Sequence, residues 1–434
     1  MRYLSLILCL LIAGACSDPA PNAASPSEAA PSAGSAVTTA VPSVTAARCR
    51  DTGLAIRATT APTTEDLGSI PGRALFWDAG VLRVLEDGRV RELRAPYFVR
   101  DWSSKITTDG RVVALLGGQA LGEAHLWEQS GSGAERLMKM PVALGTDDVA
   151  TWSPGAQRVH WGTFGGTEMW IVGLDGSSHR ATFPGHAVYA AAWRTDDELT
   201  VVSAPATNTG WPIVDATLWS WRPPALPARF AGPLSLAVWP RWSPDGRLLA
   251  TIEALPDGRA VVLRGDASRT ILTERDLAVG PDNCVRDISF MGLSWSPDAR
   301  TLAVLGRGAG YFAAFITIRS SSPAVMFTAP MSEATCYIPG RIDWYGASAV
   351  VPLFGPDCGS NAAGSENALA LVDPKNGSAR YVTISRKGFL ALSGGWAVAA
   401  SGNREKTTEF ISLAGQGPRV NAPLWRLVDY CCVD

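Results

Sequence analysis

A tryptophan-centred repeat constrains the fold of this chain more than any other feature of its sequence. The clear copies are Trp152-Ser153-Pro154-Gly155, Trp242-Ser243-Pro244-Asp245-Gly246-Arg247 and Trp295-Ser296-Pro297-Asp298-Ala299-Arg300, and degraded copies begin at Trp102, Trp193 and Trp344. Successive tryptophans lie about 40 to 53 residues apart, which is the span of one four-stranded blade. The repeat therefore predicts a series of similar β-sheet units.

Each copy has a physical interpretation. The tryptophan ends an inner strand and packs between neighbouring units. Ser-Pro-Asp-Gly forms a turn because proline presets φ, aspartate bonds to nearby backbone and glycine accepts a positive φ. A short apolar strand follows, as at residues 248–252 and 301–305. A strand that is apolar on both faces suits a sheet packed between two other sheets.

These Trp-Ser-Pro-Asp-Gly copies resemble the TolB-type, WD-repeat-like propeller repeat, and the pattern extends over residues 70–430. The resemblance implies an all-β fold, a β-propeller of four-stranded antiparallel blades, and such repeats specify fold far better than function. TolB itself also carries an N-terminal domain ahead of its propeller. A Pro/Ala/Ser-rich segment takes that place here, so a role within the Tol system does not carry over.

Counting pairs of third and fourth strands predicts eight blades, with seven as the alternative. The first unit, at residues 81–93, is not preceded by a segment with the clear pattern of an inner strand. Residues 424–430 supply one, because Val428-Asp429-Tyr430 matches Ile342-Asp343-Trp344 in kind and position. We therefore expect residues 49–434 to form a single propeller domain closed by the C-terminal strand, which removes open sheet edges.

The N-terminal residues have the character of a targeting segment. Arg2 precedes an apolar run at residues 4–12, and Ala13-Gly14-Ala15-Cys16 resembles a bacterial lipobox. We expect residues 1–15 to be a lipoprotein signal peptide and Cys16 to be lipidated; the alternative is ordinary cleavage after Ala15. Residues 16–48 predict a disordered tether. The protein would be exported and lipid-anchored to the bacterial cell membrane, facing the periplasm or the exterior.

Export makes the cysteines beyond Cys16 disulfide candidates. These cysteines are Cys49, Cys284, Cys336, Cys358, Cys431 and Cys432. We expect a Cys336–Cys358 bridge between adjacent loops, and a bridge from Cys49 to Cys431 or Cys432 that fastens the closure of the ring. The alternative for the closing bridge is that one or both ends are free or pair with each other.

Four long connections, at residues 204–215, 276–287, 329–340 and 356–366, fall on the face opposite the Ser-Pro-Asp-Gly turns. Long loops on a rigid scaffold often carry binding sites. The candidate ligand-binding residues on these loops are Asn208, Trp211, Asp282, Arg286, Tyr337, Asp357, Asn361 and Glu366. The alternative is that the loops are merely long and held by disulfides.

The sequence contains no recognisable catalytic, cofactor or metal-binding pattern. Gly292-Leu293-Ser294-Trp295-Ser296 lacks the second glycine of a nucleophile elbow, and the four histidines lack metal-site spacing. A net charge of −2 argues against nucleic acid. We expect a non-enzymatic, monomeric envelope lipoprotein whose long-loop face binds a protein, peptide or cell-wall ligand, without cofactor or metal. The alternatives are a propeller-type lyase or glycan hydrolase acting at the central channel, and a structural or sensory ectodomain.

Overall fold

A computed structural model describes the strands of the propeller and many of the turns between them. The described residues are 63–64, 67–70, 72–78, 81–86, 88–95, 99–107, 109–117, 124–130, 133–140, 148–207, 212–278, 288–307, 311–318, 320, 324–328, 342–353, 367–384, 390–393, 396–400, 408–413, 419–422 and 426–431. All of them belong to the unit Val41–Asp434. No helix among these residues has the length and apolar character needed to cross a membrane.

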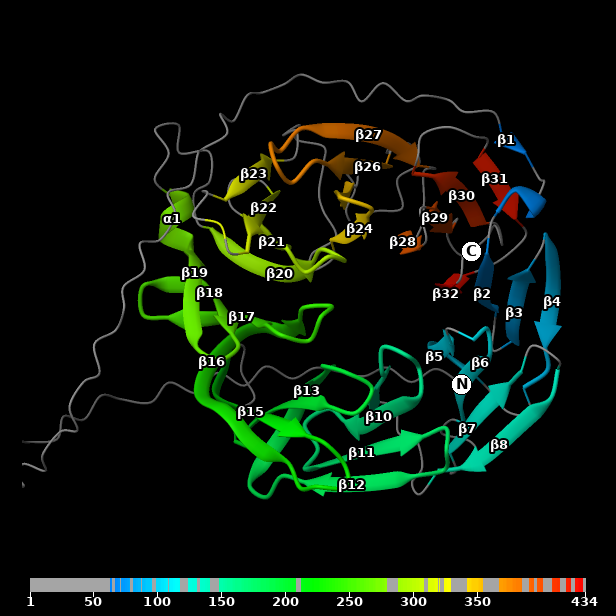
Figure 1. Ribbon diagram of the computed structural model, residues 1–434, viewed down its shortest axis with the longest axis horizontal. Helices are drawn as coiled ribbons and strands as arrows, with labels where there is room; N and C mark the ends of the chain where they lie inside the picture. The colour runs from blue at the N-terminus through cyan, green and yellow to red at the C-terminus, as the bar shows by residue number, and fades with distance from the viewer. Residues whose placement is uncertain are drawn as a thin grey trace, which may run out of the picture. The chain divides into compact units, whose positions relative to one another are not determined.

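Five sheets are separate four-stranded antiparallel blades (Figure 1). Four of these blades use consecutive strands: β5(Val99–Ile106), β6(Val112–Gly117), β7(Ala124–Gln129) and β8(Glu135–Lys139); β9(Asp148–Trp152), β10(Arg158–Thr163), β11(Glu168–Gly173) and β12(Ser178–Thr182); β20(Ser289–Trp295), β21(Thr301–Arg307), β22(Tyr311–Thr317) and β23(Val325–Thr328); β24(Asp343–Tyr345), β25(Ser348–Leu353), β26(Asn367–Val372) and β27(Ala379–Ile384). The fifth contains β32(Arg426–Cys431), β2(Arg73–Asp78), β3(Val81–Glu86) and β4(Arg89–Leu93).

The C-terminal strand closes the propeller, as the sequence predicts. Strand β32 pairs antiparallel with β2 in a register that places Tyr430 opposite Ala74 and Leu427 opposite Phe76. Phe76 also packs edge-on against Phe410 of β30(Thr408–Ser412), with 5.8 Å between the ring centroids. The first and last strands of the ring are therefore joined by hydrogen bonds, and buried apolar side chains join β2 to β30 of the neighbouring sheet.

The prediction of eight, or alternatively seven, uniform four-stranded blades is wrong, because only five of the described sheets have that form. The sixth sheet has seven strands: β13(His186–Trp193), β14(Leu199–Pro205), β15(Ile213–Trp221), β16(Ala228–Trp242), β17(Leu249–Leu255), β18(Gly258–Arg264) and β19(Ser268–Thr273). The seventh has five: β1(Thr63–Thr64), β31(Arg419–Ala422), β30, β29(Trp396–Ala400) and β28(Leu390–Ser393). Two short helices, η1(Leu67–Ser69) and α1(Glu274–Ala278), complete the described elements.

The seven-stranded sheet arises because β16 continues where the sequence predicted a break. Its residues 228–236 pair with β15, and its residues 236–242 pair with β17. One 15-residue strand thus serves as the outer strand of one unit and the inner strand of the next. The run from Leu234 to Trp242 is rich in apolar and aromatic residues that favour extended backbone, and this explains why no separate connection forms.

Buried apolar side chains fill the interfaces between neighbouring sheets. Every residue of β6 and of β7 is buried, so these strands contribute apolar surface to both faces of their sheet. Clusters of buried residues join the β5–β8 blade to its neighbours on both sides. This arrangement confirms the interpretation of the short apolar runs as strands that are packed between two other sheets.

The repeated tryptophans link each unit to the one before it. The indole N–H of Trp193 donates to the Thr151 carbonyl, and that of Trp295 donates to the Arg241 carbonyl, each at 3.0 Å. Trp344 donates to the Ser294 hydroxyl at 3.1 Å. In all three cases the acceptor residue directly precedes the tryptophan of the previous unit.

The turns after the tryptophans are held by side-chain hydrogen bonds. Ser243 donates its hydroxyl to Asp245 at 2.6 Å, and the same hydroxyl oxygen accepts the amide of Leu248 at 3.0 Å. Ser296 and Asp298 repeat the first of these contacts at 2.7 Å. The fourth turn position needs a positive φ: it is Gly246 at +65° in one copy and alanine at +58° in the other.

We expect Trp295→Phe to lower the free energy of unfolding by at least about 1 to 2 kcal/mol, because the hydrogen bond to Arg241 is lost and the smaller phenyl ring leaves part of the buried site unfilled. The urea midpoint measures this change. Leu226→Ala is the control, since Leu226 is 83% exposed and its truncation should change the free energy by less than about 0.5 kcal/mol. Equal midpoints for Trp295→Phe and wild type would refute the structural role of the indole N–H.

Candidate functional site

The site residues predicted from the sequence lie outside the described part of the chain. This holds for the loop residues Asn208, Trp211, Asp282, Arg286, Tyr337, Asp357, Asn361 and Glu366, and for Cys16, Cys49, Cys284, Cys336, Cys358 and Cys432. Cys431 is described through its backbone, which pairs with Arg73 in the closing sheet. The binding residues and disulfides expected from the sequence therefore remain predictions.

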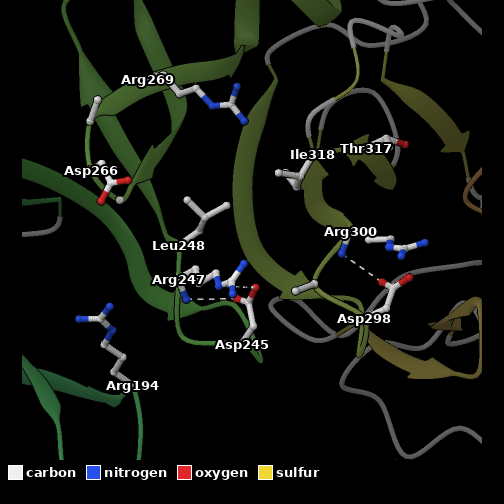
Figure 2. Close-up of a pocket in the computed structure, with 13 residues that line it drawn as sticks. Arg194, Asp245, Arg247, Leu248, Asp266, Arg269, Asp298, Arg300, Thr317 and Ile318 are labelled. Carbon is white, nitrogen blue, oxygen red and sulfur yellow. Dashed lines mark hydrogen bonds and ion pairs between the residues drawn. The ribbon is translucent and has the colours of Figure 1, made fainter.

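A cavity of about 830 Å³ opens on the face of the propeller that carries the Ser-Pro-Asp-Gly turns, opposite the face predicted to carry the long loops. Its walls are turns between first and second strands and between third and fourth strands, and we call the face that carries them the turn face. The lining residues come from the β16–β19 unit, the β20–β23 blade and the segment after Trp193: Arg194, Asp245, Arg247, Leu248, Gly265, Asp266, Ala267, Arg269, Asp298, Ala299, Arg300, Thr317 and Ile318 (Figure 2). We call it the arginine cavity.

Two rigid turns form adjacent walls of the arginine cavity. In one, the Asp245 carboxylate accepts the Ser243 hydroxyl and also the amide of Arg247, at 2.6 and 3.1 Å. In the other, Asp298 accepts the Ser296 hydroxyl and the amide of Arg300, at 2.7 and 3.0 Å (Figure 2). Because these carboxylates bond to their own turns, they fix the backbone from which the arginine side chains project.

Arg194 stands apart from the other three arginines because its guanidinium is already bound within the protein. It donates to the Gly246 carbonyl at 2.7 Å and to Glu198 at 3.1 Å, and it lies 4.8 Å from the centre of the Trp242 ring. Burial alone would raise the pKa of Glu198, but hydrogen bonds from Ser220 and Arg222 and the charge of Arg194 lower it overall. Arg194 therefore supports the wall of the cavity.

Arg247, Arg269 and Arg300 are exposed residues that line the arginine cavity. Arg247 lies 3.9 Å from Asp245, which is a loose ion pair with 73% of the arginine side chain exposed. Among the described residues, the Arg269 and Arg300 side chains donate no hydrogen bond, and the charge of Arg300 acts on the nearby Asp298 carboxylate. A guanidinium carries five N–H donors, so the cavity holds many donors that remain available to a ligand.

The described acidic residues of the cavity are poorly suited to act as general acids. Hydrogen bonds from the Ser296 hydroxyl and the Arg300 amide lower the pKa of Asp298. Asp245, Asp266 and Asp298 are all exposed to solvent. A general acid in hydrolysis or elimination needs a raised pKa, which usually comes from burial. The arrangement therefore favours recognition by fixed charges over proton transfer.

The inner strands, which the sequence offered as an alternative site at the central channel, carry isolated polar groups in the described part of the chain. On inner strand β16, desolvation by the surrounding protein lowers the pKa of Arg241. His160 lies on the second strand β10 rather than on an inner strand; it is fully buried, and its Nδ1 lies 2.8 Å from the hydroxyl of Thr151 on inner strand β9. Within the described ranges, no three His, Cys, Asp or Glu residues form a group able to hold a metal ion.

Sequence reasoning did not identify the arginine cavity, although most of the cavity's residues belong to the repeat that it analysed. It treated the Ser-Pro-Asp-Gly-Arg copies as structural turns and placed the site on the longer connections of the opposite face. The arginines at positions 247 and 300, which end two copies of the motif, were the available signal. Arg269 and Thr317, which lie near the ends of strands β19 and β22, carried no sequence signal of their own.

Comparison with known proteins does not assign a family. No protein-family model and no curated protein matches the sequence. A prolyl endopeptidase structure aligns with a TM-score of 0.49 and 12% identity over 74% of this chain and 50% of its own, so this chain spans half of its length. Oligogalacturonate lyase from Vibrio parahaemolyticus aligns with a TM-score of 0.45 and 12% identity, covering 81% and 96% of the two chains. TolB from Acinetobacter baumannii aligns with a TM-score of 0.36 and 11% identity, covering 82% and 81%.

These three similar structures are a peptidase, a lyase and TolB, so they do not distinguish binding from catalysis. The propeller architecture itself rests on the strand pairing described above.

The buried histidine generates a prediction about acid stability. Burial lowers the pKa of His160 from 6.5 to about 3. Between pH 6.5 and about pH 3, this histidine is therefore protonated in the unfolded chain and neutral in the folded chain. Acidification through this window should therefore destabilise the fold by up to ~4–5 kcal/mol from this residue alone. Urea unfolding at several pH values between 7 and 4 measures the free energy of unfolding. We expect this free energy to fall less on acidification for His160→Phe than for wild type. Parallel pH dependences would contradict this assignment.

Proposed function

We propose that this protein is a non-enzymatic, cell-envelope binding module that holds a protein, peptide or cell-wall ligand in the arginine cavity. The observation that carries the proposal is the set of exposed residues Arg247, Arg269 and Arg300 around one open cavity. Two of them project from turns that are fixed by serine–aspartate hydrogen bonds. The proposed site is thus on the turn face, rather than on the long-loop face that the sequence first suggested.

The rigidity of the turns supports a binding role. Ordering side chains and loops upon association costs free energy, so a surface that is held in place before the ligand arrives binds more tightly. Arg247 and Arg300 leave their turns directly after amides that are hydrogen-bonded to Asp245 and Asp298. Their backbone positions are therefore fixed, and only the side chains must become ordered around a ligand.

The lowered pKa of Asp298 supports binding rather than catalysis. Glycan cleavage commonly pairs a carboxylate with a carboxylic acid whose pKa is raised. The Asp298 carboxyl has the opposite character, because its hydrogen bonds within the turn lower its pKa. An ionised Asp298 would attract complementary groups without exchanging protons.

The envelope location is proposed from the N-terminal sequence. A lipid on Cys16 would anchor the chain, and residues 16–48 would act as a tether that spans roughly 30 Å as a flexible coil. Such a tether would hold the propeller away from the membrane. Ligands in the surrounding wall or periplasm could then reach the turn face.

The binding role predicts that Arg269→Glu weakens ligand binding. The purified propeller would be applied to an array of synthetic twelve-residue peptides of varied composition, and retained peptides would be analysed by mass spectrometry. We expect Arg269→Glu to reduce binding of retained peptides about tenfold or more, since it replaces a donor-rich cation by a like charge to Asp266.

The matched control is Arg89→Glu, because Arg89 is exposed on outer strand β4 in another blade. Loss of peptide binding in both Arg269→Glu and Arg89→Glu would argue against the arginine cavity as the binding site. Cleavage of a retained peptide that depends on the cavity residues would replace the binding role with an enzymatic one.

The proposed anchor has a separate test. In a bacterial host, the full chain should partition into the detergent phase of a Triton X-114 extraction and incorporate labelled palmitate. Cys16→Ser should abolish both properties, because the acylated thiol is lost. Detergent-phase partitioning of Cys16→Ser would exclude Cys16 as the anchor, whereas aqueous partitioning of the wild-type chain would favour ordinary cleavage after Ala15.

A further inference from the structure

We infer that the arginine cavity recognises a peptide segment that presents a carboxylate beside an aliphatic side chain. This inference rests on the proposed binding function and names the chemical class of its ligand. It follows from three properties of the cavity: the excess of unused hydrogen-bond donors, the apolar surface between those donors, and the acidic residues around them.

The first property is the balance of donors and acceptors. Asp245 and Asp298 each use one carboxylate oxygen to accept two hydrogen bonds from their own turns. In the described part of the chain, the Arg269 and Arg300 side chains have no such partner. The protein therefore offers donors, and the ligand must supply acceptors. A carboxylate matches a guanidinium with two parallel hydrogen bonds, which are stronger than hydrogen bonds between neutral groups.

The second property is the apolar surface inside the cavity. Figure 2 shows Leu248 and Ile318 between Arg269 on one side and Arg247 and Arg300 on the other. Ile318 is 8% exposed and Leu248 is partly buried, so both belong to the edge of the core between the two units. An aliphatic ligand side chain could cover this surface while an adjacent carboxylate reaches an arginine. Burial of such a side chain is favourable in proportion to the apolar area covered.

The third property selects against ligands of dense negative charge. Asp245, Asp266 and Asp298 line the same cavity as the three available arginines, so the local charge is nearly balanced. Closely spaced phosphates would meet these carboxylates as like charges. A peptide with a single carboxylate avoids that repulsion, and its backbone amides can donate to Asp266, which has no hydrogen-bond partner among the described residues. An acidic peptide is therefore favoured over a polyphosphate or a nucleic acid.

The test uses fluorescein-labelled peptides in matched pairs, Gly-Ser-Leu-Glu-Leu-Ser-Gly and Gly-Ser-Leu-Gln-Leu-Ser-Gly, both with amidated C-termini. Fluorescence anisotropy with the purified propeller measures the Kd of each. We expect the glutamate peptide to bind at least about tenfold more tightly than the glutamine peptide, because a charge-assisted pair replaces a neutral one. Removing the C-terminal amide from the glutamine peptide adds a terminal carboxylate and distinguishes a chain end from an acidic side chain as its source.

Variants connect the effect to the cavity. Of Arg269→Gln and Arg300→Gln, the one that removes the arginine paired with the carboxylate should abolish most of the preference for glutamate over glutamine, whereas Arg89→Gln on β4 should retain it; a preference that survives both substitutions would overturn the inference. Leu248→Ser should weaken both peptides equally, because it removes apolar surface without touching the charge. Urea midpoints close to that of wild type would show that each variant is folded.

The outcomes separate this inference from the proposed function. Equal affinities for the glutamate and glutamine peptides, both weakened by Arg269→Gln, would overturn the carboxylate preference while the cavity remains a binding site. A phosphoserine peptide that binds more tightly than the glutamate peptide would overturn the selection against dense charge. Binding of all peptides that is insensitive to every cavity variant would overturn both the inference and the proposed site.

Discussion

The indole hydrogen bond between successive units is the interaction on which the rest of this propeller depends. Apolar packing between sheets is strong but has little directional preference, so by itself it leaves neighbouring sheets free to slide. Trp193 and Trp295 pack in the interface between units, and each also donates to a backbone carbonyl of the previous unit. Each of these hydrogen bonds fixes the position of one inner strand relative to the next. Trp242 achieves a similar link through the Thr200 hydroxyl at 2.9 Å. Each unit thus positions the next.

The position of each tryptophan also fixes the position of the turn that follows it. Because the Ser243 and Ser296 turns lie at the ends of positioned inner strands, they occur side by side on the turn face, and their arginines meet around one cavity. At other interfaces a side chain bridges neighbouring turns: Lys105 donates to the Pro154 carbonyl at 3.1 Å, and Asp196 accepts the Gly155 amide at 2.7 Å. The repeat therefore provides stability at several interfaces and a candidate ligand site at one.

Part of the architecture could be predicted from the residues, and the exceptions have physical causes. The closing strand was identified correctly because residues 428–430 repeat a local pattern seen in other inner strands. The turn at Thr107 and Asp109 was missed, since threonine replaces serine and a shift in register within β5 separates the turn from Trp102. The blade count failed at β16, where a continuous strand replaces a connection. Counting repeats assumes that each unit forms a separate sheet. Backbone hydrogen bonding allows one long strand, such as β16, to pair with strands of two units.

By itself, the sequence determined the all-β class, the alternation of strand and turn, and the closure of the ring, because each depends on local chemistry that repeats along the chain. Strand periodicity, proline, glycine and aspartate act within a few residues of their positions. Only the tertiary structure decided where the candidate site lies, because Arg194, Arg247, Arg269, Arg300 and Ile318 come from five separate segments. Their convergence depends on how one unit packs against the next, and no local pattern encodes that contact.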